Sequence, residues 1–572
     1  MIYYSCDFET TTDPADCRVW LWEARNLYDP TDRHRGINIE SFIEWVLSLH
    51  GCQLSFHNLK FDGQFIVSHL LKIGWEWTTD KKVRGKRFST LISDKGAWYT
   101  IVIGQPKGCI KVVDSLKLLP FSIERIAVDF HLPMLKGSID YTMHREEGYM
   151  PTANEIQYID NDVDIAAEAL KALYDDGMKR LTIGSCALNF YKGMCRHFDG
   201  YFPKPDYDAD VRQGYRGGWT FANPLFQGQD IGEGIVLDVN SLYPWAMSEC
   251  MLPYGAGVWK KGQLTATKYY PLFIQHLSCQ FELKPHHVPT IQIHGNPNFN
   301  PTEYLASSHG LIVDLCLSSV DLALFLEHYD VYNLEYHSGW LFKGKAGIFR
   351  DYVAYWTKEK VQAKKAGNYA RYILSKLMLN NLYGKFSTNP HTASKEPVLQ
   401  DDGSVKYSIR EEDPKEPVYI PVGIFVTSWA RDKTIRAAQK LIDRFLYADT
   451  DSLHLIGTEI PEDLQVDPYI LGAWDHEASF KRARYLHAKC YIEDMYAEPD
   501  DTGKLHYVNY KTDYSKLKVT VAGLPAHCHE QVTWDNFGIG ARYEGKLKPR
   551  IVPGGVVLED IPFEIRRCFV LD

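Results

Sequence analysis

Hydrophobic and polar residues alternate at the very start of the chain. Between Ile2 and Glu9 every second side chain is apolar, as in a β-strand, and Asp7 and Glu9 fall together on the other side. Two carboxylates about 7 Å apart on one face of a strand repel each other unless a cation lies between them. The pattern is typical either of a metal site or of an exposed edge strand, the more common reason for such acids.

A strand followed by a helix is predicted a little further along the chain. The apolar run that begins at Leu54 ends near Asn58, and the helical pattern of Phe65 to Leu71 comes after it, with Asp62 between the two. Asp62 is placed to join the acids of the first strand, although a surface acid is the ordinary alternative.

A longer helix is predicted from a capping box, in which Thr152 is followed three residues later by Glu155. An apolar stripe of helical period continues from there. Tyr158 and Asp162 are four residues apart, so they lie on the same side of this helix, beside the stripe. They too have a plain surface interpretation.

Further acids follow apolar runs in the second half of the chain. One such run ends in Asp238, and the chain is expected to break at Pro244. The segment Tyr447 to Ile456 is interpreted as a hairpin with Asp449 and Asp451 on one face at its tip. Because aspartate is common in turns, ordinary turn residues explain both positions equally well.

A helix is predicted from Tyr369 to Phe386. Outside its apolar face, Lys376, Asn380 and Tyr383 share one side at positions i, i+4 and i+7. A triphosphate needs a cation and a sugar or base needs a flat ring nearby, so this side suits an incoming nucleotide. Gly384 leaves room for close approach of a backbone or base pair. An ordinary amphipathic helix is the alternative.

Composition indicates a globular protein of several domains. The chain has 572 residues, of which 45% are hydrophobic and 24% charged. No apolar run approaches the roughly 20 residues that span a bilayer, and the 12 cysteines include no Cys-x-x-Cys pair. We therefore expect a soluble, unexported protein with reduced cysteines.

The net charge of −10 argues against a protein that coats nucleic acid through a uniformly positive surface. Any site for a polyanion must be local. Basic residues are concentrated from Lys343 to Lys376 and again from His476 to Lys489. A solvated helical face explains either stretch equally well.

The motifs of the N-terminal third resemble, in order and spacing, the three exonuclease motifs of the DnaQ-like proofreading domains in family B DNA polymerases. The resemblance covers about residues 1–183 and implies an RNase H-like fold with 3′-5′ exonuclease activity. The matching motifs are Asp7-x-Glu9, Asn58-x-x-x-Asp62 and Tyr158-x-x-x-Asp162.

This resemblance also implies roles for single residues. Tyr158 orients the attacking water, and Lys136 matches the catalytic lysine of the family. The ligands of two metal ions are Asp7, Glu9, Asp62 and Asp162. The residues that hold a frayed single strand are His57, Asn58, Phe61, Ser115 and Leu116.

The second half of the chain resembles motifs A, B and C of family B DNA polymerases, in that order. The matching segments are Asp238-Val-Asn-Ser-Leu-Tyr-Pro244, Lys376-x-x-x-Asn-x-x-Tyr-Gly384 and Tyr447-x-Asp-Thr-Asp451. The resemblance implies template-directed DNA synthesis with two Mg²⁺ or Mn²⁺ ions in each active site, held here by Asp238, Val239 and Asp451, with catalytic Asp449 close by.

Contacts with nucleotide and DNA follow from the same resemblance. Tyr243 lies beneath the sugar and excludes a 2′-hydroxyl, and Tyr383 packs on the base pair. Lys360 and Lys376 bind the triphosphate. The same nucleotide site also includes Val239 and Asn380. The linker motif is Tyr215-Arg216-Gly217-Gly218, the primer-contacting motif is Lys489-x-Tyr491, and the thumb motif is Val552 to Leu558.

Two long gaps between motifs resemble the insertions of the protein-primed, strand-displacing subfamily found in small podophages. The first, about Leu252 to Ala346, implies contact with a terminal protein. The second, about Thr388 to Pro417, has Asp402-Gly403 as the turn of a hairpin, which implies enclosure of the template and unwinding of the downstream duplex.

The expected fold is α/β and α+β, with an exonuclease domain followed by palm, fingers and thumb. The expected partners are primer-template DNA, deoxynucleotides, a terminal protein and single-stranded DNA. The protein is expected to be a monomer and to act in the cytoplasm of an infected bacterium. The expected boundaries are 1–183 for the exonuclease, 184–248 and 420–522 for the palm, 249–347 and 388–419 for the insertions, 348–387 for the fingers, and 523–572 for the thumb.

Two alternatives stay open. A nucleic-acid-primed family B polymerase would lack the two insertions, and a catalytically silent DNA-binding scaffold would lack motif carboxylates. A stand-alone exonuclease would leave about 390 residues unexplained.

Overall fold

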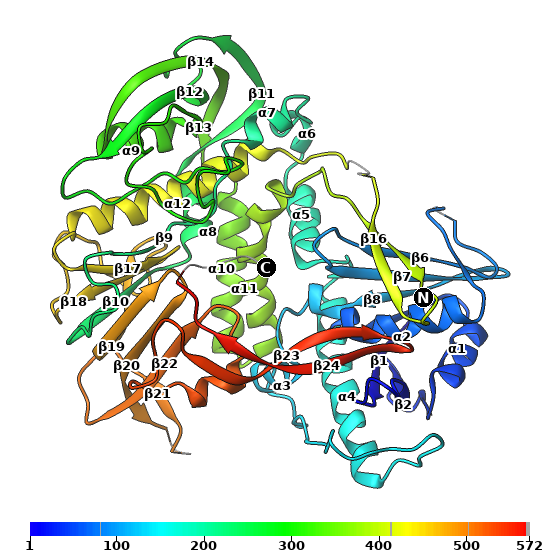
Figure 1. The fold of residues 1–572 in the computed structure, drawn as a ribbon. Helices are drawn as coiled ribbons and strands as arrows, with labels where there is room; N and C mark the ends of the chain where they lie inside the picture. Colours follow the sequence, from blue (N-terminus) through cyan, green and yellow to red (C-terminus); the bar gives the residue numbers. More distant parts are fainter. Residues whose placement is uncertain (81, 412–414, 501–502, 568–572) are drawn as a thin grey trace.

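Two large β-sheets lie on either side of a pair of long helices, α10 and α11 (Figure 1). This arrangement comes from a computed structural model that describes residues 1–80, 82–411, 415–500 and 503–567. The end of the predicted thumb, residues 568–572, lies outside the described residues. No helix of the described part of the chain is both long and apolar enough to cross a membrane.

The N-terminal sheet is mixed, with strand order β3-β2-β1-β4-β8-β7-β6-β5, and β4 lies parallel to both β1 and β8. Its strands are β1 Ile2–Thr10, β2 Val19–Asn26, β3 Arg33–Gly36, β4 Cys52–Phe56, β5 Glu76–Trp77, β6 Arg87–Ile92, β7 Trp98–Gln105 and β8 Gly108–Asp114. Its helices are α1 Ile39–Ser48, α2 Leu59–Lys72, η1 Ser115–Lys117, α3 Ile123–Asp129 and α4 Ala153–Asp175.

The alternation along β1 divides its side chains between two layers. Tyr4, Cys6 and Phe8 are buried in one core with residues of α1 and α2. Helix α4 packs against β1 and β2, where its Ile159 and Val163 meet the buried side chains of β2. The predicted capping box is present at the start of α4 and sets where this helix begins.

The second sheet has the order β21-β20-β19-β10-β18-β17-β9, and β22 also pairs with β20. Its strands are β9 Thr220–Ala222, β10 Gly234–Val239, β17 Phe445–Asp449, β18 Ser452–Ile456, β19 Trp474–His487, β20 Cys490–Pro499, β21 Leu505–Tyr507 and β22 Tyr514–Val521. The helices around it are α5 Ile183–Met194, α6 Phe198–Tyr201, α7 Asp208–Arg212, α8 Leu242–Glu249 and α12 Ile420–Lys440.

One detail of the sequence prediction is wrong at this sheet. The chain does not break at Pro244, because β10 already ends at Val239 and α8 begins at Leu242. Pro244 lies in the first turn of α8, where the missing N–H of a proline costs no helical hydrogen bond.

The first insertion contains a four-stranded antiparallel sheet of its own, in the order β11-β14-β12-β13. Its elements are β11 Met251–Lys261, β12 Leu272–Leu283, β13 Val313–Ser318, α9 Ser319–His328 and β14 Tyr329–Ala346. Figure 1 shows it in green above the second sheet. A separate core of buried residues, which includes Phe281 and Phe325, supports it.

The two central helices are α10 Arg350–Lys365 and α11 Tyr369–Phe386. Two hairpins then reach toward the N-terminal sheet (Figure 1): β15 Lys395–Leu399 with β16 Val405–Ile409, and β23 Arg542–Val552 with β24 Gly555–Glu564; the short helix η2 Ala526–Gln531 precedes the latter. Val405 and Val556 are buried in the same core as β1 and α2. The hairpins therefore connect the N-terminal sheet to two segments of the second half of the chain.

Candidate active sites

Four carboxylates from three elements meet at one cavity in the N-terminal sheet. Asp7 and Glu9 come from β1, Asp62 from the first turn of α2, and Asp162 from α4. All four line a cavity of about 580 Å³. The structure thus brings together the acids that the sequence placed far apart.

The acids of this cavity are buried and repel one another. Burial, with the nearby charge of Asp162, raises the pKa of Asp7 to about 7, and burial also raises the pKa values of Glu9, Asp62 and Asp162. One oxygen of Asp162, Oδ1, is buried without a hydrogen-bond donor. A cluster of this kind is stabilised by divalent cations, for which carboxylate oxygens are preferred ligands.

The clustering is loose in the described part of the chain: no three His, Cys, Asp or Glu side chains there already surround a common point. The four acids share a cavity instead of a closed cage. Lys136 also lines the cavity and forms an ion pair with one of the acids: its Nζ lies 2.9 Å from Asp162 Oδ2. This ion pair raises the pKa of Lys136 against the opposing effect of burial, so the lysine stays charged.

Two tyrosines stand beside the acids. The hydroxyls of Tyr158 and Tyr141 are 3.1 Å apart, and burial raises the pKa of both. Tyr158 was predicted for this site, whereas Tyr141 was not. Tyr141 belongs to the same loop as Lys136, but a loop has no periodicity from which the direction of a side chain can be inferred.

The predicted single-strand contacts fall into two groups. Asn58, with its backbone in the left-handed region (φ 75°), and Phe61 line the cavity with exposed or half-buried side chains. Leu116 is also half-buried, on η1. His57 lines the cavity too, but its ring contacts Ser115 Oγ (3.0 Å) and Phe121 O (2.7 Å). Ser115 is buried and donates to Phe56 O, so it supports His57 instead of facing the cavity.

A second set of carboxylates lies where three strands of the other sheet end. Asp238 is near the end of β10, Asp449 ends β17, and Asp451 lies in the tight turn to β18, in which Thr450 has φ 62°. Val239 N donates to Asp451 O at 2.8 Å, which fixes the two segments side by side. The three acids line a cavity of about 360 Å³.

Burial and mutual repulsion act here as well. Burial, together with Asp451, raises the pKa of Asp238 to about 8, and burial with Asp449 raises the pKa of Asp451 to about 6. Lys489 reaches in from the turn between β19 and β20, with its Nζ 2.6 Å from Asp449 Oδ2. Asp449 is therefore paired with a cation of the chain itself.

Two charged residues of this cavity escaped the sequence analysis. Glu477 and Lys518 both line it. The charge of Glu477 contributes to raising the pKa of Asp238, and the charge of Lys518 opposes it. Glu477 lies in the second basic stretch and belongs to none of the motifs. Glu477 falls where the register between β10 and β19 shifts, between the pairs Leu237–His476 and Val236–Ala478, two residues from Asp475, the partner of Asp238.

Aromatic and basic side chains of α8, α10 and α11 form two further pairs. Tyr243 from α8 and Tyr383 from α11 are stacked, with ring centroids 4.1 Å apart. Lys360 on α10 and Lys376 on α11 are close enough that burial and the charge of Lys376 both lower the pKa of Lys360. Asn380 is exposed on the same helix as Lys376. An unneutralised pair of cations suits a triphosphate.

The linker motif is held by contacts within the protein. Arg216 is buried, and its Nη1 donates to Cys316 O at 2.7 Å. Arg431 holds the backbone of the motif through the carbonyls of Arg216 and Gly217. Tyr215 is half-buried and Gly217 exposed. Tyr491, although it lines the cavity, is mostly buried against Tyr447.

The basic stretches also differ from each other. In the second, Arg484 is paired with Asp230 at 2.6 Å and, like Arg482, lies over the ring of Trp534, so part of this stretch joins the second sheet to the C-terminal hairpin region. A further cavity, of about 530 Å³ beside α5 and α11, is lined by the cations Lys111, Lys179, Arg180, Lys192 and Lys385. Cationic side chains are thus gathered in particular places of this acidic protein, as expected from its net charge of −10.

Comparison with known proteins agrees with this architecture. The family model described as DNA polymerase type B, organellar and viral, matches residues 47–155 and 145–467. The DNA polymerase of Bacillus phage phi29 is 46% identical over 576 residues, which is 98% of this chain and 99% of that protein.

Solved structures of phi29 DNA polymerase superpose on nearly the whole chain. The complex with primer-template DNA and incoming nucleotide substrates gives a TM-score of 0.92 at 44% identity, and the complex with single-stranded DNA gives 0.93 at 45%. Each superposition covers 99% of this chain and 100% of that chain. The expected exonuclease-type sheet with palm, fingers and thumb is confirmed, and the chain belongs to the organellar and viral type B DNA polymerases.

Proposed function

We propose that this DNA polymerase synthesises DNA at the cluster of Asp238, Asp449 and Asp451 and removes misincorporated nucleotides at the separate cluster around Asp7. The proposal rests on one observation: each cluster lines its own cavity on its own sheet. Primer-template DNA, deoxynucleotides and single-stranded DNA are the substrates and partners that we infer from the complexes of phi29 DNA polymerase.

DNA polymerases of this family need divalent metal ions, and we propose two Mg²⁺ at each cluster. When bound, such ions stabilise the charge that develops on the entering and leaving oxygens of a phosphodiester. In the synthetic site, Asp238, Asp451 and the carbonyl of Val239 would hold them. Lys489 keeps Asp449 paired and lies where a primer strand would enter.

The nucleotide is held by the residues around the synthetic carboxylates. Lys360 and Lys376 neutralise the triphosphate, because their own repulsion is relieved by an anion. The stacked rings of Tyr243 and Tyr383 form a flat floor under the sugar and the new base pair. Exclusion of a 2′-hydroxyl by Tyr243 would select deoxynucleotides. Asn380 contacts the nucleotide from the same helix.

In the exonuclease site, the carboxylates of β1, α2 and α4 would hold the ions. Tyr158, on the same helix as Asp162, orients the attacking water, and the charge of Lys136 stabilises the scissile phosphate. Asn58 and Phe61 hold the frayed strand by polar and stacking contacts, supported by His57, Ser115 and Leu116.

The two insertions support protein-primed initiation and strand displacement. We place this activity in the cytoplasm of an infected bacterium, because the relatives are phage proteins. The first insertion has its own core and sheet, as a docking domain for a terminal protein requires. The second reaches the C-terminal hairpin, where a Cβ added at Gly403 would lie 3.6 Å from Pro553 Cβ. DNA between the two hairpins would be enclosed.

The proposal is tested by removing one carboxylate at a time. Asp238→Ala should abolish primer extension, a loss of at least about a thousandfold, while leaving degradation of a single-stranded oligonucleotide within about twofold of the parent. Asp7→Ala should do the reverse.

Both activities are measured on the full chain with 5′-labelled oligonucleotides and Mg²⁺. Loss of both activities in either single variant would refute separate sites. Extension of a primed circle into products longer than the circle, without helicase or clamp, tests strand displacement. Transfer of the first nucleotide to a protein hydroxyl tests protein priming against a nucleic-acid primer.

A further inference from the structure

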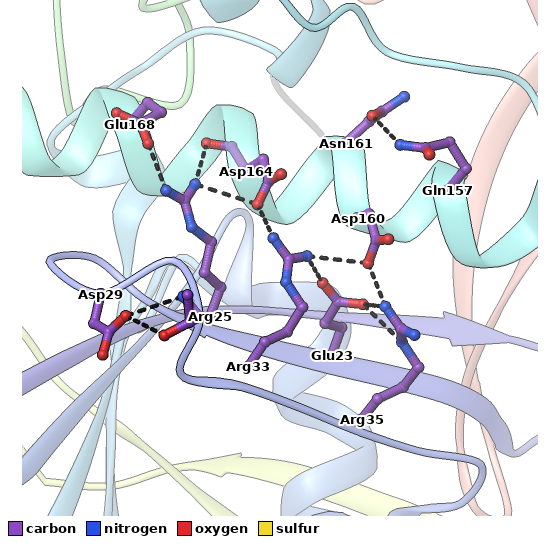
Figure 2. A network of polar contacts seen from close by, with 11 residues as sticks. Glu23, Arg25, Asp29, Arg33, Arg35, Gln157, Asp160, Asn161, Asp164 and Glu168 are labelled. Carbon is purple, nitrogen blue, oxygen red and sulfur yellow. Dashed lines mark hydrogen bonds and ion pairs between the residues drawn. The ribbon is translucent and has the colours of Figure 1, made fainter.

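Helix α4, which carries Tyr158 and Asp162, is tied to the edge of the N-terminal sheet by a network of charged residues (Figure 2). We define the arginine–carboxylate network by its seven members: Glu23, Arg25, Arg33, Arg35, Asp160, Asp164 and Glu168. We propose that this network positions α4 for the exonuclease reaction, so that its arginines are positioning residues of proofreading. The inference rests on the proposed exonuclease function.

The sheet side of the network is adjacent to the exonuclease carboxylates. In the strand register, Asp7 of β1 is the partner of Glu23 in β2, and Glu23 is the partner of Arg35 in β3. Directly opposed residues of an antiparallel pair project from the same face. Glu23 therefore lies in one row with the ligand residue Asp7, and the network begins one strand away from the reaction.

Glu23 is fully buried, with no exposed surface, and is held by two arginines. Arg35 binds Glu23 Oε2 through Nη2 at 2.6 Å and Nε at 2.9 Å, and Arg33 contacts Glu23 Oε1. A buried carboxylate is tolerated only with such partners. The two guanidinium groups are in turn fixed in direction, because each donates a rigid fork of N–H groups.

The same arginines reach the helix. Arg33 Nη1 lies 3.0 Å from Asp160 Oδ1 and its Nη2 lies 2.5 Å from Asp164 Oδ1, while Arg35 also contacts Asp160. Arg25, nearly buried, bridges Asp164 and Glu168 one turn further on. Figure 2 shows the three arginines rising from the strands toward successive turns of α4.

The helix side of the network faces away from the reaction. Asp160 and Asp164 are two residues before and after Asp162, which places each about 200° around the helix from it. Apolar contacts of Ile159 and Val163 with the sheet hold α4 down but have little directional preference. Charge-assisted forks fix its rotation and its position along the strands.

That rotation matters because the exonuclease ligands come from different elements. Asp162 and Tyr158 are on α4, whereas Asp7 and Glu9 are on β1. A shift of α4 moves the first pair relative to the second, and an error of about 1 Å in such a site can lower a rate about a hundredfold. The synthetic site shares none of these elements, so it should not respond.

The test compares Arg33→Gln, Asp164→Asn and the double variant in the full chain. The matched control is Asp175→Asn, which removes a carboxylate from the same helix outside the network, where it pairs with Lys171 and contacts Tyr28. Single-turnover digestion of a single-stranded oligonucleotide gives the rate and the half-saturating oligonucleotide and Mg²⁺ concentrations. Extension of a primed template is measured in parallel.

Each single variant should lower the exonuclease rate at least about fivefold and raise the half-saturating Mg²⁺ concentration, with oligonucleotide affinity and extension within about twofold of the parent. Because Arg33 and Asp164 are partners, the exonuclease rate of the double variant should be no lower than that of the less active single variant. The control should behave as the parent does.

Three results would overturn the inference. One is an exonuclease rate in the single variants equal to that of the Asp175→Asn control. Another is an equal loss of exonuclease and extension, which would indicate general destabilisation. The third is strictly additive losses in the double variant. An inactive parent exonuclease would instead reject the proposed function itself, so the two failures can be told apart.

Discussion

Gly218 shows how one missing side chain sets the geometry of the synthetic site. A Cβ added there would lie 2.6 Å from Thr450 Oγ1 and 2.7 Å from its Cγ2. Thr450 stands between Asp449 and Asp451 in a backbone conformation with φ 62°, so it has little freedom to move aside. The glycine allows the linker motif and the catalytic turn to pack in direct contact.

Gly218→Ala should therefore displace the turn and lower the rate of primer extension by about ten- to a hundredfold. Single-strand degradation should stay within about twofold, because the other sheet is untouched. Steady-state extension and digestion assays measure both. Gly232→Ala is the matched control, since a Cβ at Gly232 meets nothing within 4 Å; equal loss in the two variants would reject the steric explanation.

Arg216 and Tyr141 show how a residue can differ from its motif. The first belongs to a motif for which DNA contact is predicted, and its buried side chain donates to Cys316 O of β13. The second carried no signal of its own, yet its hydroxyl meets that of Tyr158. Both are decided by contacts with segments distant in the chain, which a local pattern does not contain.

Among the secondary-structure elements, four strands beneath the synthetic site, β18, β19, β20 and β22, are joined by a buried carboxylate. Glu493 of β20 contacts His454 of β18 at 2.5 Å and Lys518 of β22 at 3.4 Å, and it accepts from Tyr485 at 2.7 Å. Burial alone would raise the pKa of Glu493, but the attraction of His454 and Lys518 outweighs it and lowers the pKa to about 2. The charged form therefore stabilises the fold.

The sign of this pKa shift sets the pH range in which stability changes. A lowered carboxyl pKa contributes stability that is fully present above the ordinary value of 4.5 and is lost as pH falls toward 2. Glu493→Gln should cost roughly 3 kcal/mol near pH 6, and the difference from the parent should shrink between pH 4.5 and 2.

Thermal unfolding across that pH range measures the effect, with the exposed Glu498→Gln on the same strand as control. A difference that stays constant down to pH 2 would show that the charge of Glu493 is not responsible.

Considered as a whole, the molecule is tied together by its two hairpins, which both contact the N-terminal domain. Tyr407 anchors the first hairpin to the N-terminal sheet: its hydroxyl donates to Gln64 Oε1 at 2.6 Å, and its ring meets Trp98 with centroids 5.4 Å apart. The second hairpin contacts α2 through β24. Both therefore rest on the domain that carries the exonuclease carboxylates, next to Asp62.

Tyr407→Ala should release the first hairpin from the N-terminal sheet. Extension on a single-stranded template should stay within about twofold, whereas products from a primed circle should shorten at least about fivefold, because the hairpin no longer helps to enclose the template. Product length on alkaline gels measures this. Tyr469→Ala, at a tyrosine that is 92% exposed, is the control; unchanged product length in Tyr407→Ala would exclude a role for the anchor.

Much of this molecule was predictable from neighbouring residues. The strand from Ile2, the capping box at Thr152, the helix from Tyr369 to Phe386 and the hairpin around Asp449 all arise from periodicity and turn chemistry within a few residues. The motif acids could be recognised because each lies on or beside such an element, at a spacing that fixes the side it faces.

Other features depend on how distant segments pack. Glu477 and Lys518 border the synthetic cavity because β19 lies beside β10 and β22 beside β20. The arginine–carboxylate network exists because α4 crosses β2 and β3. Spacing along a chain encodes which side of a strand or helix a residue occupies, but burial against another element decides what that side meets, and that free energy belongs to the packed tertiary structure alone.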